Sequence, residues 1–168
     1  MNWIAAAALA VQILLLLYVA ATDIATRLIH NEICLALALL GIAGQFSSPP
    51  HLAESLIAAT ILFLLLIVIY ERGWIGGGDV KLLASLAIGL PLTGLTQLLT
   101  VTALAGAVLA LAHLMMRLLP HPRPAPAGSP LLRRVYAVER WRNLRHAPLP
   151  YGAAIACGGI WTLLRQGF

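Results

Sequence analysis

The sequence is short of charge. Only 10% of its 168 residues are Asp, Glu, Lys or Arg, whereas soluble domains carry roughly 25%. Among the charged residues the acidic ones are fewer, with 6 Asp and Glu against 11 Lys and Arg. Because 61% of the residues are hydrophobic and the mean hydropathy is +0.91, a soluble domain of this length could not bury so much apolar surface. The composition excludes an ordinary soluble protein and predicts an integral membrane protein.

Cysteine is scarce as well. Cys34 and Cys157 lie in separate apolar segments and form no C-x-x-C pair, which excludes a zinc ribbon and a disulfide framework. The histidines show no ligand spacing such as H-E-x-x-H, and no serine lies in a G-x-S-x-G setting. We therefore expect neither a metal site nor a serine nucleophile.

The sequence contains long apolar runs. The run from Trp3 to Thr22 has no charged residue, and at about 1.5 Å per residue it matches a hydrocarbon core about 30 Å thick. Further runs are Ile33 to Phe46, Ser55 to Tyr70, Leu82 to Leu90, Leu95 to Met116 and Tyr151 to Leu164. To reach the length of a membrane span, the helices of the short runs must include flanking residues such as Asp79 to Lys81. The sequence thus predicts an all-α, polytopic membrane protein with about six transmembrane helices.

The basic residues predict the orientation of these spans. With the N-terminus outside, ten of the eleven Lys and Arg residues lie on the cytoplasmic side and only Arg165 lies outside. The reversed arrangement would break the positive-inside rule at the same ten residues. The net charge of +5 is thereby explained without nucleic acid, so we expect no nucleic-acid partner.

The segment from Pro120 to Pro150 holds seven of the ten prolines and six of the arginines. We predict that it is a cytoplasmic basic loop within a single domain of residues 1–168. Part of it alternates apolar residues with arginines, at Val135, Val138, Trp141 and Leu144. This part would form either a basic helix bound to anionic membrane lipid or a solvated charged loop, and the sequence leaves both open.

Three of the acidic residues, Asp23, Glu32 and Asp79, stand apart from the others because they lie at helix junctions. Glu54, Glu71 and Glu139 lie at span ends or in the basic loop and are interpreted as solvated charges. Asp23 closes the first span and Asp79 opens the fourth, both on the cytoplasmic side. Two carboxylates brought close together cannot both ionise easily, so such a pair can act as general base and general acid on a water. This is the arrangement that an aspartic protease needs.

A run of three glycines, Gly76, Gly77 and Gly78, directly precedes Asp79. Glycine allows close backbone approach, and an open backbone could pair with an extended peptide. A flexible turn between two spans is the alternative. Lys81 either anchors the fourth helix at the headgroups or lies near Asp79. The residues alone leave these alternatives open.

Two segments carry a resemblance to a known family. The stretch from Asp23 to Asn31 ends in Ile-His-Asn, and the stretch from Gly76 to Leu82 reads GGGDVKL. They resemble motifs of the type IV prepilin peptidases, a bacterial branch of the GxGD membrane aspartyl proteases. In that family the first stretch ends in Ile-Pro-Asn, so His30 replaces a proline here, and the second reads GxGD-x-K-L. A weaker likeness is Pro150-Tyr151-Gly152, where the family often has a Pro-aromatic-Gly sequence.

The resemblance implies a function and a site. It implies a single transmembrane peptidase domain in the bacterial inner membrane that cleaves prepilins or pseudopilins at the cytoplasmic face, just before their hydrophobic helix, with no metal or organic cofactor. It implies that Asp23 and Asp79 are the catalytic pair. The residues that would shape the loop or bind substrate are Gly76, Gly77, Gly78, Lys81 and Asn31.

The resemblance also predicts a subtype. The long members of the family carry a cytoplasmic insertion with two C-x-x-C pairs and methylate the new pilin N-terminus. This sequence has no such insertion, so we expect a peptidase without methyltransferase activity, similar to the short members associated with tight-adherence pili. Two other classes stay open. One is a small transporter in which Asp23 and Asp79 relay protons or bind a cation, and the other is a noncatalytic subunit of a pilus or secretion assembly.

Overall fold

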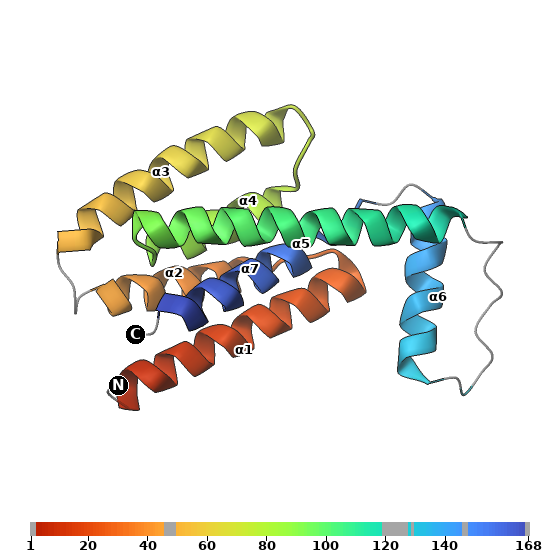
Figure 1. The fold of residues 1–168 in the computed structure, drawn as a ribbon, viewed down its shortest axis with the longest axis horizontal. Helices are drawn as coiled ribbons and strands as arrows, with labels where there is room; N and C mark the ends of the chain where they lie inside the picture. The colour runs from red at the N-terminus through yellow and green to blue at the C-terminus, as the bar shows by residue number, and fades with distance from the viewer. Residues whose placement is uncertain (1–2, 46–49, 119–127, 129, 146–147, 167–168) are drawn as a thin grey trace.

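The computed structural model describes residues 3–45, 50–118, 128, 130–145 and 148–166. Every regular element in these residues is a helix, which confirms the all-α prediction. Each predicted apolar run overlaps a helix of its own, and one further helix lies between the last two runs (Figure 1). The helices are α1 (Trp3–Thr26), α2 (Asn31–Gln45), α3 (Pro50–Glu71), α4 (Gly77–Ile88), α5 (Leu92–Leu118), α6 (Leu131–Leu144) and α7 (Tyr151–Gln166).

Three of the described helices are long and apolar enough to cross a membrane, namely α1, α5 and the part of α3 from Ala53 to Glu71. The helices α2, α4 and α7 have 15, 12 and 16 residues, fewer than the roughly 20 that span a bilayer without distortion. The chain is therefore a helical protein suited to a membrane. A count of six spans and an outside N-terminus stay predictions.

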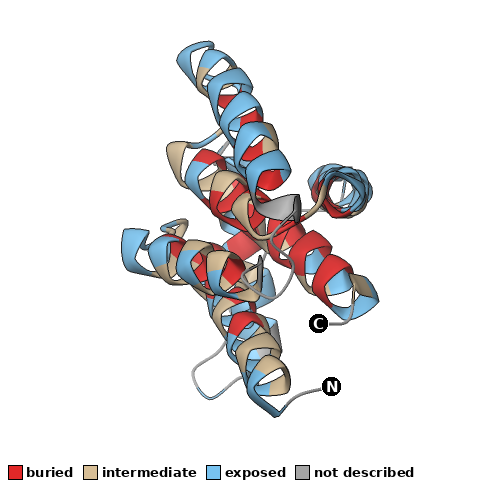
Figure 2. Ribbon diagram, turned by 90° about the vertical axis from the view of Figure 1, so that its left-hand side faces the viewer, coloured by how far each residue is buried: buried red, intermediate tan, exposed pale blue. Residues whose placement is uncertain are grey.

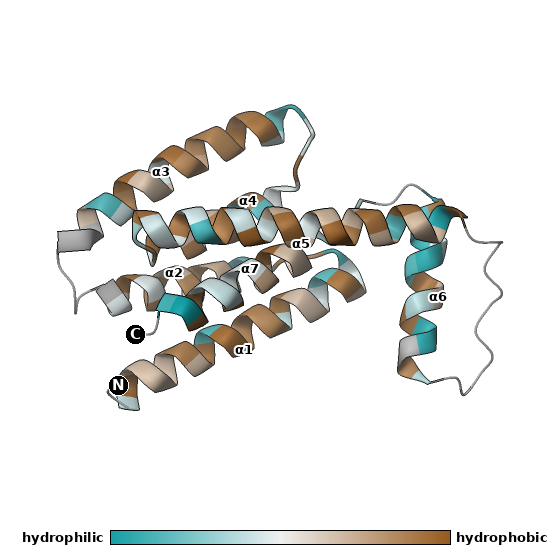
Figure 3. Cartoon of the chain, viewed as in Figure 1, coloured by the Kyte–Doolittle hydropathy of each residue, from teal (hydrophilic) through white to brown (hydrophobic). Residues whose placement is uncertain are grey.

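The short helices lie at the centre of the bundle. Helix α7 packs between α1 and α5, helix α4 packs between α2 and α3, and α4 and α7 contact each other. Figure 2 shows the buried residues gathered through the middle of the bundle, where Leu16, Leu82 and Ile155 are fully buried. The long helices expose apolar side chains over much of their length, and Figure 3 shows that hydrophobic residues dominate these helices. An apolar surface of this extent is what lipid tails cover.

Close backbone contacts hold the central helices in place. A Cβ added to Gly41 of α2 would lie 2.7 Å from the Cα of Gly89, which ends α4. A Cβ added to Gly158 of α7 would lie 2.3 Å from the hydroxyl oxygen of Thr102 on α5. These small residues therefore seat helices of the same chain against one another.

Helix α6 lies crosswise to the bundle, beyond the ends of α1 and α7 and against the end of α5 (Figure 1). It falls inside the segment 120–150, of which residues 120–127, 129 and 146–147 lie outside the described residues. Of the two alternatives that the sequence left open for the stretch around Trp141, the structure has the helix. Contact of this helix with lipid stays a prediction.

Candidate active site

Asp23 lies in the last turn of α1 and is 5% exposed. The helix ends three residues later, and Arg27, with φ of 61°, turns the chain away in the left-handed conformation typical of helix C-termini. The backbone N–H of Ala153, in the first turn of α7, donates to Oδ2 of Asp23 at 3.3 Å. This contact with the N-terminus of α7 orients the carboxylate.

Gly152 makes room for the Asp23 carboxylate. A Cβ at this position would lie 2.9 Å from Oδ2 of Asp23 and 2.9 Å from Cδ1 of Ile29, closer than real Cβ contacts. Sequence reasoning singled out Gly152 only as part of a weak motif likeness and missed its contact with Asp23. The Pro-Tyr-Gly sequence at the start of the last apolar run was the available signal.

The turn between α3 and α4 positions the glycine run at the site. Helix α3 ends in a Schellman motif, in which Gly73 has φ of +72°. The N–H of Gly73 donates to the carbonyl of Tyr70 at 2.8 Å, and the N–H of Trp74 donates to that of Ile69 at 3.3 Å. The chain then returns to the bundle, and Gly76 precedes α4 with extended backbone angles.

Asp79 lies in the first turn of α4, directly after the three glycines. A Cβ on Gly76 would lie 3.0 Å from Oδ2 of Asp79, and a Cβ on Gly78 would lie 3.2 Å from Cβ of Ile29. Ile29 therefore packs against both Gly78 of α4 and Gly152 of α7, next to the two aspartate-bearing helices. An added Cβ on Gly77 would lie 3.3 Å from the ring of Tyr70, so each of the three glycines has a side chain close by.

Asp23 and Asp79 line one cleft with a volume of about 730 Å³. The five other residues predicted from the sequence, Gly76, Gly77, Gly78, Lys81 and Asn31, line the same cleft. Nζ of Lys81 donates to Oδ1 of Asn31 at 3.1 Å, which links the beginnings of α4 and α2. The structure thus brings all the predicted site residues together, although it does not test their roles.

Sequence reasoning missed several residues that line the cleft, among them Arg27, Ile29, Trp74, Leu149 and Tyr151. Each lies within or close to one of the motif segments, which is the signal that could have found them. Trp74 is 78% exposed in the turn between α3 and α4. Within the part of the chain that the structure describes, no three His, Cys, Asp or Glu residues are grouped as metal ligands would be.

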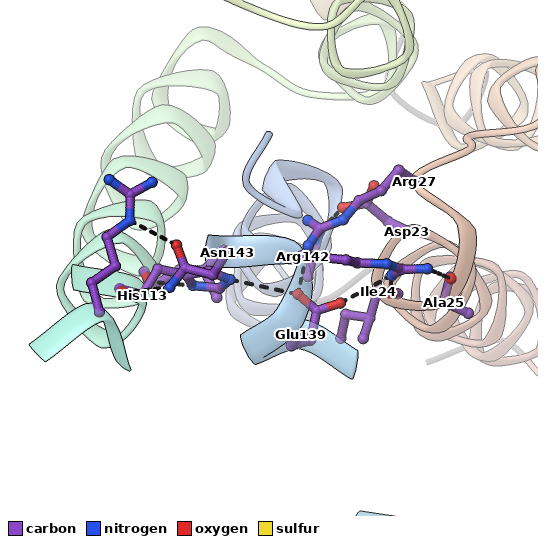
Figure 4. Close-up of polar contacts among 11 residues, drawn as sticks. Asp23, Ile24, Ala25, Arg27, His113, Glu139, Arg142 and Asn143 are labelled. Atoms are coloured by element: carbon purple, nitrogen blue, oxygen red, sulfur yellow. Dashed lines mark hydrogen bonds and ion pairs between the residues drawn. The ribbon is translucent and has the colours of Figure 1, made fainter. Parts of the chain in front are cut away.

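Glu139 of α6 is buried, so its interpretation as a solvated charge was wrong. It is 8% exposed and lies among three basic side chains (Figure 4). Its carboxylate accepts from Nη2 of Arg27 at 2.6 Å and from Nη1 of Arg142 at 3.1 Å, and Nε2 of His113 lies 3.6 Å away. A buried carboxylate needs such partners, and α6 obtains them by turning this polar face toward the bundle.

Helix α6 also binds the ends of two other helices. Arg142 donates to the carbonyl oxygens of Ile24 and Ala25 at 2.8 and 2.6 Å, which lie in the last turn of α1, where carbonyls lack intrahelical partners. Asn143 donates to the carbonyl of His113 at 2.6 Å and accepts from Nε of Arg117 at 2.9 Å, both on α5. We call Glu139, Arg142 and Asn143 the α6 clamp (Figure 4).

The fold and the cleft define a helical protein suited to a membrane, with two aspartates in one open cleft at the ends of its helices. A family model described as the type IV leader peptidase family matches residues 10–111. The chain belongs to this family. The matched region contains both aspartates and the glycine run, whereas α6 and α7 lie beyond it.

A curated relative agrees with this family. The chain is 28% identical to the Prepilin leader peptidase/N-methyltransferase of Pectobacterium carotovorum subsp. carotovorum, over 91% of this chain and 49% of that protein. It thus spans about half the length of this relative. No solved structure matches the chain.

Proposed function

We propose that the chain is an aspartyl endopeptidase that removes the basic leader from type IV prepilins or pseudopilins. One observation carries the proposal. Asp23 of α1 and Asp79 of α4 line one open cleft. Membership of the type IV leader peptidase family and the name of the curated relative support the same reaction. The sequence has no C-x-x-C pair, so we propose peptidase activity without methyltransferase activity. This favours the short members of the family that are associated with tight-adherence pili.

In the proposed mechanism, one ionised aspartate takes a proton from a water, and the water oxygen attacks the scissile carbonyl carbon. The protonated partner donates a hydrogen bond to the carbonyl oxygen and then gives its proton to the leaving amine nitrogen, so that the peptide bond breaks. The N–H of Ala153 holds the Asp23 carboxylate in place for this reaction. The backbone of Gly76 to Gly78 lines the cleft, and in this proposal an extended substrate pairs with it.

The distribution of basic residues supports a cytoplasmic site. The ends of α1, α3 and α5 lie together with α6 at one end of the bundle (Figure 1). Arg27, Arg72 and Arg117 belong to that end, whereas Arg165 lies near the end of α7 on the other side. By the positive-inside rule this arrangement favours a multi-pass protein of the bacterial inner membrane with its N-terminus outside, its spans being α1 to α5 and α7. Transport sites usually lie near the midplane, so aspartates at helix ends favour the peptidase over a transporter.

The test is cleavage in bacterial membranes. A tight-adherence prepilin is co-expressed with wild type, Asp23→Asn or Asp79→Asn, and its size is followed on gels while membrane levels of the peptidase are checked by immunoblot. Glu71→Gln is the matched control, because Glu71 is an exposed carboxylate at the end of α3. We expect cleavage by wild type and the control and none by the two Asn variants. Cleavage by either Asn variant at the wild-type rate would contradict the mechanism.

A further inference from the structure

A second hollow lies between α3 and α4. It is a groove of about 350 Å³, lined on α3 by positions 56, 59, 60 and 63 and on α4 by positions 81, 84, 85 and 88. Each set has the spacing i, i+3, i+4, i+7, which places it on one face of its helix. The groove is therefore formed by two matching helix faces and runs along both helices for about 10 Å, at about 1.5 Å per residue.

The groove and the cleft that holds the aspartates share a lining residue. Lys81 lines both hollows, and it follows Asp79 by two residues in the first turns of α4. From Lys81 the groove leads along α4 to Ile88, away from Asp79. A molecule in the groove would therefore have one end at the cleft.

The lining of the groove suits an apolar helix. Apart from Lys81, its lining residues are apolar or carry a hydroxyl. The hydroxyl of Thr60 donates to the carbonyl of Leu56 at 2.7 Å, and that of Ser85 donates to the carbonyl of Leu82 at 2.8 Å, so both hydroxyls are satisfied within their own helices. A helix satisfies its own backbone groups in lipid, and small residues such as Ala84 allow it to approach closely.

We propose that this groove binds the apolar transmembrane helix of the substrate. The residues that precede this helix then pass Lys81 and extend into the cleft between Asp23 and Asp79. The inference rests on the proposed function and adds a second recognition element to it, because the groove binds the span while the cleft binds the cleavage point. A lipid tail is the competing occupant.

The first experiment fills the groove. Thr60→Trp and Ala84→Trp place a large side chain in it, and Ala103→Trp places the same side chain on an exposed face of α5 as the matched control. Each variant is given a full-length prepilin and a short peptide that holds the leader and cleavage point without the apolar helix. We expect the groove variants to cleave the prepilin at least tenfold less efficiently, through a raised KM, and to cleave the peptide as wild type does. The control should leave both rates unchanged.

The second experiment locates the substrate directly. In the inactive Asp79→Asn background, a photoreactive benzoylphenylalanine replaces Ala84 or, as control, Ala103. Crosslinking of the prepilin span at position 84 and not at 103 would support the proposal. Crosslinks to lipid alone, prepilin cleavage at the wild-type rate by both groove variants, or equal loss of both substrates would overturn it. If wild type cleaves neither substrate, the proposed function fails, and the crosslink still decides whether the groove binds a prepilin.

Discussion

Two buried carboxylates at the same end of the molecule have different surroundings. Glu139 accepts from the guanidinium groups of Arg27 and Arg142 at 2.6 and 3.1 Å. Asp23 accepts a backbone N–H from Ala153 at 3.3 Å and faces an open cleft beside glycine. A carboxylate held by two guanidinium groups fixes structure, whereas one that lines a cleft can bind a water there. Burial alone does not separate a carboxylate suited to catalysis from one that stabilises the fold. The groups that contact the carboxylate do.

The largest expected effect comes from the cleft carboxylates. Asp23→Asn and Asp79→Asn should each lower the cleavage rate about 100-fold or more, because in the proposed mechanism each removes a group that transfers a proton. The double variant should be no slower than the slower single variant, since the two residues act as a unit. Rates from gel assays at equal protein levels provide the measurement. A multiplicative loss in the double variant would contradict paired action.

Gly152→Ala should have the next largest effect. The new Cβ would lie 2.9 Å from Oδ2 of Asp23, so the carboxylate must move, and displaced catalytic groups cost about 10- to 100-fold in rate. Cys157→Ala, on an exposed position of the same helix, is the control and should cleave as wild type does. An unchanged kcat for Gly152→Ala would show that the carboxylate position is not critical.

Glu139→Gln should act on stability. The substitution leaves Arg27 and Arg142 beside each other without their shared carboxylate, and we expect a loss of about 2 to 3 kcal/mol in the free energy of unfolding. Thermal unfolding in detergent measures this loss, with Glu71→Gln as the exposed control. The cleavage rate of the folded variant should fall far less than that of the aspartate variants. A melting temperature equal to that of the control would show that the α6 clamp adds no stability.

The smallest expected effect concerns the exposed side of α6. Val138 and Arg134 are exposed there, and one arginine near an anionic membrane contributes about 1 kcal/mol. A fluorophore on Val138→Cys, in a Cys157→Ala background, should shift to the blue in anionic vesicles and not in zwitterionic ones. Adding Arg134→Gln should weaken that response by about fivefold at most. The same emission in both kinds of vesicle would favour a solvated helix.

The sequence predicted the helices well, because they depend on local patterns. Uninterrupted apolar runs marked six of the helices, and α4 begins with flanking residues that include Asp79 and Lys81, as its short run required. The motif segments around Asp23 and Asp79 lie at helix ends, so their residues meet once the bundle packs. Their catalytic roles stay predictions.

The contacts that the sequence could not predict join residues far apart in the chain. Arg27 and Glu139 are separated by 112 positions, and Asp23 and Ala153 by 130. The pattern of α6, with apolar residues between arginines, describes an amphipathic helix but not the direction in which its polar face turns. That direction depends on the unsatisfied carbonyls at the end of α1, where Arg142 binds.

The position of α7 against Asp23 has a consequence for biosynthesis. The ribosome makes both aspartates before it makes Gly152 and Ala153, which complete the surroundings of Asp23. Because membrane helices enter the bilayer as the chain grows, the cleft stays unfinished until α7 has been translated and has packed between α1 and α5. The surroundings of Asp23 are therefore assembled only after α7 has been made.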